Sequence, residues 1–504
     1  RPFMRFTSLV VELIRARPLL VVWIVVLFQA IWLTVPLLLY RGPPGDLATA
    51  LAFGREYRVG TDLGPPLAFW LGDIAYRAAG NHMFGVYLLS QLCFIVAFRV
   101  LYELARTIVG GPQAVLAILL TMTVTAFGAP GLTFGPLVLA FPLWSLLLLH
   151  SWQIIAQGRR NAWFALSIEA GVLLLTTPAA AGLLLLLAVF AMATARGRKA
   201  LESVEPLFAL LVIAVLALPY LIWLVRADAL GEPPWPPIFE LHLRLLRWGE
   251  LLISLIIAMS GLALLVVLNS NLVNWKPEDA PVIVRPPVDP LARNFVYVFA
   301  LAPALGGSFV AALFGVDHVV GGAAIALLMS GLAVVLLSGE VIHLRRLRVL
   351  RAAWLAAVVA PALAVIATIV VQPWFASTEV ATSIPASAIS RFFGENFQRR
   401  TSRPLQAVAG DPQLAALVAL GPSRPHLLLD ATPGRTPWIT LERFNELGGV
   451  VVWRASDTAG TPPAAIAQRF PGIVPEIPRA FDRLVNGRLP PLRIGWGIVR
   501  PKAS

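Results

Sequence analysis

Long apolar stretches alternate with short polar segments along the first 375 residues. Many of these stretches have 18 residues or more, enough for a helix to cross a hydrocarbon core of about 30 Å. The pattern predicts a polytopic α-helical membrane protein with about eleven transmembrane helices: 18–40, 84–105, 112–128, 132–154, 162–177, 178–195, 206–225, 250–269, 294–315, 319–338 and 352–372. The first stretch lacks a small-residue cleavage site after it, so we expect a retained helix and not a signal peptide.

The stretch 162–195 decides the predicted orientation of the chain. As one helix it would be about 51 Å long at 1.5 Å per residue, far longer than one crossing. The sequence "TTPAAAG" in its middle predicts a break. With that break, the basic segments between helices all fall on one side, which the positive-inside rule makes the cytoplasm. Segments 41–83 and 226–249 and the chain after about 373 are then expected on the outer side.

The last part of the chain has a different pattern. From about residue 376, short apolar runs are separated by Pro, Gly and Asp. "HLLLD" (426–430), "VVVWRA" (450–455) and "LRIGWGIV" predict strands, and "TPWITLERFNELGG" predicts a helix that Thr440 caps and Gly448 or Gly449 ends. We therefore expect two domains, a transmembrane domain at 1–375 and a small extracytoplasmic α/β domain at 376–504.

Asp430 follows the first of these predicted strands. Ligand-binding groups are common at strand ends in α/β sheets, but an aspartate before "ATPG" also fits a turn that accepts backbone hydrogen bonds.

Composition supports the membrane class and excludes several others. The chain has 504 residues, of which 58% are hydrophobic and 13% charged, against about 25% charged in ordinary soluble domains. The net charge of +13 is spread between apolar segments, which argues against nucleic-acid binding. A single cysteine, Cys93, excludes an intramolecular disulfide. The six histidines are scattered, so no metal site is predicted, and no nucleotide or cofactor motif is present.

Segment 41–83 is the strongest candidate for chemistry. "RGPPGD" turns the chain after the first helix and brings Asp46 close to the membrane interface. Two interfacial helices are predicted next, the second opened by a double proline and carrying Phe69, Trp70 and Tyr76 at headgroup depth. Connections of about 40 residues are uncommon unless functional, although a solvated connection with anchoring helices fits the composition equally well.

A carboxylate and arginines at one interface suit proton abstraction from a hydroxyl group beside a lipid phosphate. Asp46 and Arg58 belong to this set of charged residues, and Arg55, Glu56 and Asp62 are further candidates for lining the site or holding an acceptor.

The order of motifs resembles glycosyltransferase family 39. The resemblance rests on the acidic residue soon after the first helix, the interfacial helix, a "PPL-x-x-WL" segment, the linker "AAGNHMFGVYLLS" and the helix ending "LYELARTIVG". It is close over about 18–110, loose through 372 and absent from the tail. That family includes dolichyl-phosphate-mannose protein mannosyltransferases and the bacterial aminoarabinose lipid A transferase, with the GT-C membrane fold.

The resemblance implies an inverting transfer of sugar from a polyprenyl-phosphate donor at the outer face of a bacterial cytoplasmic membrane. The catalytic aspartate of the family falls on Asp46, and Arg58 falls near a cationic position used at the donor phosphate. The sequence departs from the pattern at three places. Leu47 stands where a glutamate is common, and Gly64 stands where His or Lys is common. "TAFGAPGL" also lacks a second acidic residue often found after the third helix.

The outer segment 226–249 adds two candidates. In "GEPPWPPIFELHLRLLRWGE", Arg244 and Arg247 lie three residues apart on one side of a predicted helix, so both could reach a donor phosphate. Leu241, Leu245 and Trp248 predict its apolar side. Anchoring of the helix at the interface without a ligand is the alternative interpretation.

Two charged features inside the spans bear on competing functions. Arg99 and Glu103 are four residues apart and predict a structural ion pair. Glu169 has no partner nearby in sequence and would suit a proton-coupled transporter. A non-catalytic membrane subunit that binds a protein partner through its tail is the third possibility beside the glycosyltransferase and the transporter.

Overall fold

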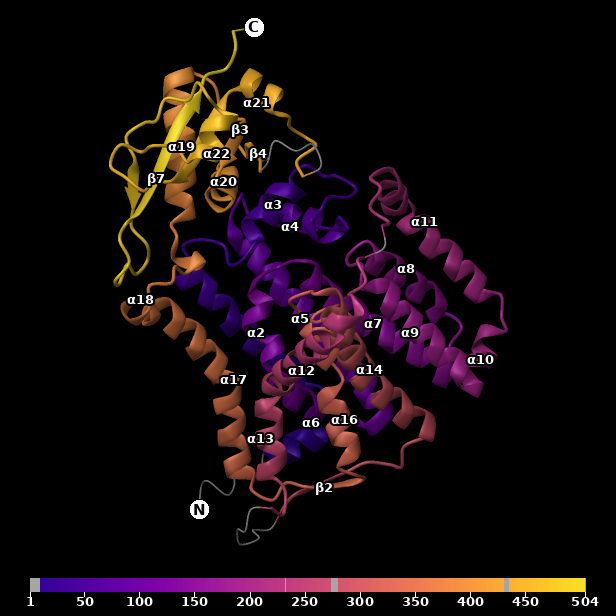
Figure 1. Ribbon diagram of the computed structural model, residues 1–504. Helices are drawn as coiled ribbons and strands as arrows, with labels where there is room; N and C mark the ends of the chain where they lie inside the picture. The colour runs from indigo at the N-terminus through magenta and orange to yellow at the C-terminus, as the bar shows by residue number, and fades with distance from the viewer. Residues whose placement is uncertain (1–9, 232, 273–279, 430–434, 504) are drawn as a thin grey trace. The chain divides into compact units, whose positions relative to one another are not determined.

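The computed structural model describes residues 10–231, 233–272, 280–429 and 435–503, which divide into two compact units (Figure 1). The helical unit holds the described residues before Leu33 together with Ser90–Gly131 and Pro136–Ala362. The mixed unit holds Leu33–Leu89, Leu132–Gly135 and the described residues from Leu363 on. Helices α2, α5 and α17 continue from one unit into the other.

The helical unit is built almost entirely from α-helices. Its elements are α2 (Leu20–Leu39), α5 (Met83–Val109), α6 (Gly111–Met122), η1 (Thr125–Phe127), η2 (Ala129–Leu132), α7 (Pro136–Gln157), α8 (Ala162–Leu174), α9 (Ala180–Ala193), α10 (Ala195–Leu201), α11 (Glu205–Arg226), η3 (Ile238–Glu240), α12 (Leu241–Ala258), α13 (Ser260–Leu268), α14 (Pro290–Phe314), α15 (Ala323–Leu327), α16 (Ser330–Leu337) and α17 (Leu347–Val370). Strands β1 (Val282–Val284) and β2 (Val341–His343) pair antiparallel.

The predicted class of a multi-pass helical membrane protein is confirmed, but the predicted count of eleven spans is not. Within the described residues, six helices are long and apolar enough to cross a membrane, or up to nine if each bent helix pair is one span. Every predicted segment contains helix, yet some helices are short. The 13 residues of α8 extend about 20 Å at 1.5 Å per residue, less than a hydrocarbon core.

The break predicted inside 162–195 is present. Helix α8 ends at Leu174 and α9 begins at Ala180, and Thr176 lies between them with its hydroxyl donating to the carbonyl of Val172 at 2.8 Å. Helix α8 packs against α7 and α11. The cytoplasmic placement of the basic segments, which this break favoured, stays a prediction.

The two charged features that the sequence singled out within the apolar helices are both paired. Arg99 and Glu103 form the ion pair that the sequence predicted, and Arg106 joins them at 2.7 Å. Glu169 has a partner that the sequence did not reveal, because His150 on α7 places its Nδ1 atom 2.7 Å from the carboxylate. Ionisable groups within spans are commonly paired in this way, in structural pairs as well as in proton relays.

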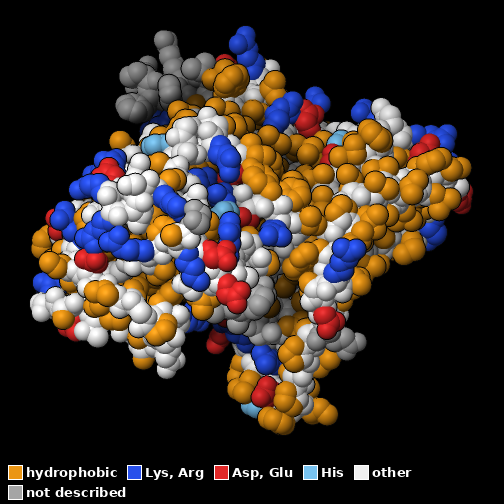
Figure 2. All heavy atoms as spheres, turned by 90° about the horizontal axis from the view of Figure 1, so that it is seen from above, with side chains coloured by type: hydrophobic (Ala, Val, Ile, Leu, Met, Phe, Trp, Pro, Cys, Tyr) orange, Lys and Arg blue, Asp and Glu red, His pale blue; other side chains and the backbone are white. Residues whose placement is uncertain are grey.

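The outer surface of the helical unit is apolar. Helix α11 exposes a row of large hydrophobic side chains, including Leu207, Phe208, Leu211 and Val215. Figure 2 shows hydrophobic side chains covering much of the surface on its right-hand side, where α11 lies. Such a surface is unfavourable in water and fits contact with lipid.

The mixed unit joins segment 41–83 to the C-terminal part of the chain. Its own elements are α3 (Leu47–Gly54), α4 (Leu67–Ala78), α18 (Gln372–Phe375), η4 (Ala381–Ser383), α19 (Ala386–Thr401), β3 (Ala407–Gly410), α20 (Pro412–Ala419), β4 (His426–Leu428), α21 (Leu441–Leu447), β5 (Gly449–Arg454), α22 (Ala464–Arg469), β6 (Arg479–Phe481) and β7 (Leu492–Val499). Helix α20 packs against α3 and α19.

A five-stranded sheet forms the centre of the C-terminal part, in the order β4-β3-β5-β7-β6. Strand β3 pairs parallel with β4 and β5, while β7 pairs antiparallel with β5 and β6. The buried residues Val451, Trp453 and Phe444 belong to one hydrophobic cluster between the sheet and α21. The small C-terminal sheet domain that the sequence predicted is therefore present.

The three predicted strands and the predicted helix of the tail are confirmed. The Thr440 hydroxyl accepts a hydrogen bond from Arg443 N at 3.1 Å, and α21 ends at Gly448 with φ at +71°. Strands β3 and β6 were missed. Asp430 lies outside the described residues, and the domain boundary at 375/376 stays a prediction.

Candidate functional site

The turn at 41–46 has its path fixed by backbone hydrogen bonds to the C-terminal part of the mixed unit. Arg41 N and Gly42 N both donate to Thr382 O, at 2.8 and 3.1 Å. A Cβ atom added at Gly42 would lie 2.6 Å from Ile384 O, so this approach of two backbones requires glycine. The chain leaving α2 is thereby held in one place before it reaches Asp46.

Asp46 occupies the N-cap position of α3, and its side chain is exposed. The preceding Gly45 has φ at +52°, and Asp46 O accepts the first helical hydrogen bond from Ala50 N at 2.9 Å. Its side chain does not cap the helix. Among the described residues the Asp46 carboxylate has neither a hydrogen bond nor an ion pair, so a ligand from outside could use both of its oxygens.

Helices α3 and α4 form where the sequence predicted them, and they pack closely. A Cβ atom on Gly54 would lie 2.1 Å from Phe69 O. Phe69 and Tyr76 do not face lipid as anchors would, because both side chains are buried within the mixed unit. Their depth in the membrane stays a prediction. The Tyr76 hydroxyl donates to Leu420 O at 2.9 Å. These aromatic groups join α4 to the C-terminal part instead.

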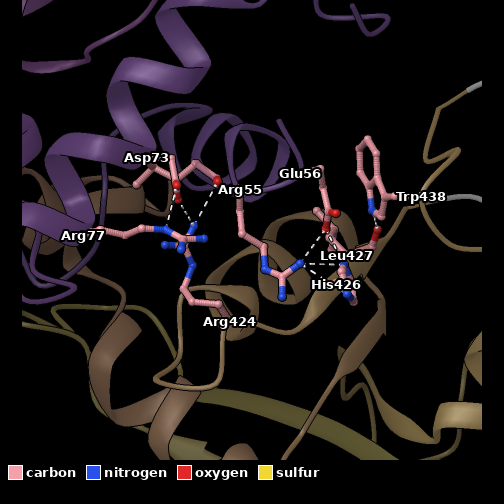
Figure 3. A network of polar contacts seen from close by, with 9 residues as sticks. Arg55, Glu56, Asp73, Arg77, Arg424, His426, Leu427 and Trp438 are labelled. Carbon is pink, nitrogen blue, oxygen red and sulfur yellow. Dashed lines mark hydrogen bonds and ion pairs between the residues drawn. The ribbon is translucent and has the colours of Figure 1, made fainter. Parts of the chain in front are cut away.

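Asp73 is a fully buried carboxylate with three partners (Figure 3). Arg77 Nε lies 2.8 Å from Oδ2 and Arg424 Nη2 lies 2.8 Å from Oδ1, while the Tyr57 hydroxyl donates to Oδ2 at 2.6 Å. Burial and the hydrogen bond to Asp73 raise the pKa of Tyr57 above its usual 10.0. Because its lone pairs are satisfied within the protein, Asp73 is suited to holding the fold together.

Glu56 lies at the centre of a second network, also drawn in Figure 3. Its Oε1 atom accepts from Arg55 Nη1 at 3.2 Å and lies 2.5 Å from Nδ1 of His426, the first residue of β4. The same Arg55 nitrogen is 2.8 Å from His426 Nδ1. Two basic side chains therefore converge on one carboxylate.

Asp62 and Arg58 are exposed, but they differ in their contacts. Asp62 Oδ2 lies 2.9 Å from Arg435 Nε in an exposed ion pair. The backbone carbonyl of Arg58 accepts from Trp70 Nε1 at 3.1 Å, which fixes the turn, whereas its guanidinium has no hydrogen bond or ion pair among the described residues. Arg58 thus keeps a cation accessible in the same segment as Asp46.

The acidic segment therefore has a structural role that the sequence did not reveal. Glu56, Asp62 and Asp73 each pair with a basic residue from the C-terminal part, and of the four acidic residues in 41–83 Asp46 alone lacks a partner among the described residues. The partners Arg424, His426 and Arg435 were missed because no local pattern marks a contact with a residue more than 350 positions away.

Arg244 and Arg247 lie in the helical unit, on α12. Arg244 Nη2 is 3.5 Å from Glu240, and Arg247 Nη1 is 2.9 Å from Glu250 and donates through Nη2 to Asp317 O at 3.1 Å. Trp248, on the predicted apolar side of this helix, packs against buried α14 residues and donates to Ser308 Oγ at 2.9 Å. The phosphate-binding role of both arginines stays a prediction.

Among the described residues, no group of three His, Cys, Asp or Glu side chains is arranged to hold a metal ion. The chemistry available at Asp46 on these observations is proton transfer by a carboxylate, with Arg58 as one accessible cation of its segment.

Comparison with known proteins finds a match to a family model and solved structures with a similar fold. The family model described as dolichyl-phosphate-mannose-protein mannosyltransferase matches residues 64–223, a range that begins after Asp46. The resemblance found in the sequence is thus confirmed for this part of the chain. No curated protein matches the chain.

Two solved structures have a similar fold. The crystal structure of ArnT from Cupriavidus metallidurans bound to undecaprenyl phosphate superposes with a TM-score of 0.57 at 14% identity, covering 96% of this chain and 99% of that chain. The apo structure of the same protein gives a TM-score of 0.51 at 15% identity with the same coverage. At these identities the likeness shows the fold, which is that of a multi-pass membrane protein.

Proposed function

We propose that this protein is a membrane glycosyltransferase that moves a sugar from a polyprenyl-phosphate donor to a lipid, glycan or protein acceptor at the periplasmic face of a bacterial cytoplasmic membrane. The observation that carries the proposal is Asp46, the exposed carboxylate at the start of α3 that has no partner among the described residues. The match to a mannosyltransferase family model and the fold shared with an undecaprenyl-phosphate-bound protein support it.

The proposed reaction is a direct displacement. Asp46 takes the proton of an acceptor hydroxyl as that oxygen attacks the anomeric carbon of the donor sugar. The bond between this carbon and the phosphate oxygen breaks, its electron pair leaves with the polyprenyl phosphate, and the anomeric configuration inverts. No nucleotide sugar is required, because the phosphate ester of the lipid is the leaving group.

Arg58 is the proposed ligand of the departing phosphate in segment 41–83, with Arg244 and Arg247 of α12 as further proposed ligands. A guanidinium that has no internal partner can pair with a phosphate without first breaking a contact. Gly64, where the family commonly has His or Lys, has φ at +109°. A side chain is disfavoured in this conformation, so this chain relies on cations other than the missing one.

The test follows release of undecaprenyl phosphate, a product common to every sugar and acceptor. Purified protein in lipid nanodiscs would receive undecaprenyl-phosphate-linked sugars together with extracted bacterial envelope lipids and glycans, with release followed by mass spectrometry. We expect Asp46→Asn to slow release by about 100-fold or more, within the range of acid–base catalysis. The control Glu395→Gln, an exposed residue of α19, should leave release unchanged.

Equal release by the wild type and Asp46→Asn would reject Asp46 as the base. Absence of release, together with a stoichiometric protein partner on purification, would favour the non-catalytic subunit. Transport of a solute into liposomes would favour the transporter, with the Glu169–His150 pair as its candidate proton site.

A further inference from the structure

We infer that a second ligand site lies within the mixed unit and binds a sugar carrying a phosphate or carboxylate group. The site is a cavity of about 420 Å³ between the end of α3 and the C-terminal part. Its walls include Arg55, Leu405, His426, Trp438, Arg443 and Leu447. A volume of a few hundred cubic ångströms is typical of small-molecule sites.

The charge of this cavity favours an anion. Arg55 and Arg443 both line it, and the carboxylate nearest to Arg55 is Glu56, which is already shared with His426. The Nε atom of Arg55 is buried and has no hydrogen-bond partner among the described residues. Arg55 therefore has hydrogen-bonding capacity that its internal contacts leave unused, and an anion beside its guanidinium would be favoured.

The apolar wall favours a sugar ring over a bare ion. Trp438 is held in place because its Nε1 atom donates to Leu427 O at 3.0 Å and its ring meets Phe53 edge to face, with centroids 4.9 Å apart. An aromatic ring with a fixed orientation can take the C–H face of a sugar. Leu405 and Leu447 extend the apolar lining, while the cations fix the orientation of a charged substituent.

Binding of an anionic sugar in this cavity does not depend on the proposed function. The identification of that sugar with the acceptor of sugar transfer does rest on it. A charged sugar held in the mixed unit would be part of the acceptor and would provide affinity away from the reacting hydroxyl. Affinity and transfer can therefore be measured separately.

The experiment measures binding to the full-length protein in nanodiscs by calorimetry, without any donor. The probes are glucose 6-phosphate, glucose and inorganic phosphate. We expect glucose 6-phosphate to bind at least tenfold more tightly than either of the others. Arg55→Gln and Arg443→Gln should each weaken it by about tenfold or more, as the loss of a charge-assisted hydrogen bond would.

Arg391→Gln is the matched control, because Arg391 is exposed on α19 and does not line the cavity. If Arg55→Gln does not fold, Arg443→Gln decides the outcome, since its guanidinium is exposed and its ion pair lies within α21. Failure of glucose 6-phosphate to bind, equal binding by both cavity variants and wild type, or equally tight binding of inorganic phosphate would overturn the inference. Asp46→Asn should bind normally, which separates this site from the proposed chemistry.

Discussion

Asp46 and Asp73 belong to the same segment, and their surroundings give them opposite properties. Asp73 is removed from water, and two guanidinium groups and a tyrosine hydroxyl compensate the loss of hydration. Asp46 keeps its contact with solvent and has no described partner. A buried charge with fixed partners is suited to specifying one fold, whereas an exposed carboxylate can exchange a proton with a substrate.

Replacement of Asp73 by asparagine is expected to destabilise the protein. The change leaves the buried guanidinium of Arg424 without its counter-charge, and breaking one partner of a buried pair costs about 3–5 kcal/mol. Thermal unfolding of the detergent-solubilised protein would measure the loss. Asp62→Asn is the control, because its ion pair with Arg435 is exposed and worth about 1 kcal/mol or less. Equal melting temperatures for the two variants would contradict the role given to Asp73.

Among single residues, Asp46 could be identified from the sequence, but the function of its acidic neighbours could not. The position of Asp46 after "RGPPG" could be predicted because glycine and proline mark a local turn. The pairing of Asp73 with Arg424 depends on how distant segments fold against each other. Neither residue type nor spacing encodes that contact in a single sequence, so Asp73 looked like one more residue of an interfacial helix.

Among the elements, the contact between α3 and α4 positions the candidate base. Leu47 and Leu51 are buried on α3, and Gly54 lets the end of α3 meet the backbone of Phe69. Because Asp46 directly precedes α3, a shift of this helix would move the carboxylate. The placement of Asp46 therefore depends on a residue eight positions away that cannot itself contact a substrate.

Gly54→Ala is expected to lower both stability and sugar transfer. The added Cβ would lie 2.1 Å from Phe69 O, so the two helices must separate. Gly394→Ala on α19 is the control for which we expect the opposite effect. No atom lies within 4 Å of its added Cβ, and alanine is more favourable than glycine within a helix by about 1 kcal/mol. The temperature of thermal unfolding should fall for Gly54→Ala and rise slightly for Gly394→Ala. A rise for both would show that α3 and α4 tolerate separation.

Elements with strong local signals were predictable, and those defined by their neighbours were not. The break between α8 and α9 follows from Thr-Thr-Pro, and α21 follows from a threonine cap and a terminal glycine. Strand β3 has the sequence Ala-Val-Ala-Gly, which is too short and too weakly patterned to mark a strand. It is recognisable only by its parallel pairing with β4 and β5, which are distant in the sequence.

For the whole molecule, the orientation in the membrane decides whether the proposed chemistry has access to its substrates. The positive-inside rule predicts that the basic connection near Arg159 lies in the cytoplasm and that the C-terminal sheet lies outside. Segment 41–83 contacts that sheet region through the Asp73–Arg424 pair, so both must lie on the same side of the membrane. A periplasmic C-terminal part therefore implies a periplasmic Asp46.

Cysteine labelling can test this orientation because the only native cysteine, Cys93, is buried. Single substitutions Gln468→Cys on α22 and Arg159→Cys between α7 and α8 introduce exposed thiols. In intact spheroplasts, a membrane-impermeant maleimide should label the first variant, and it should label the second only after permeabilisation. Wild-type protein should remain unlabelled in both conditions. The reverse pattern would place Asp46 in the cytoplasm, where the proposed transfer at the outer face could not occur, while the fold itself would be unaffected.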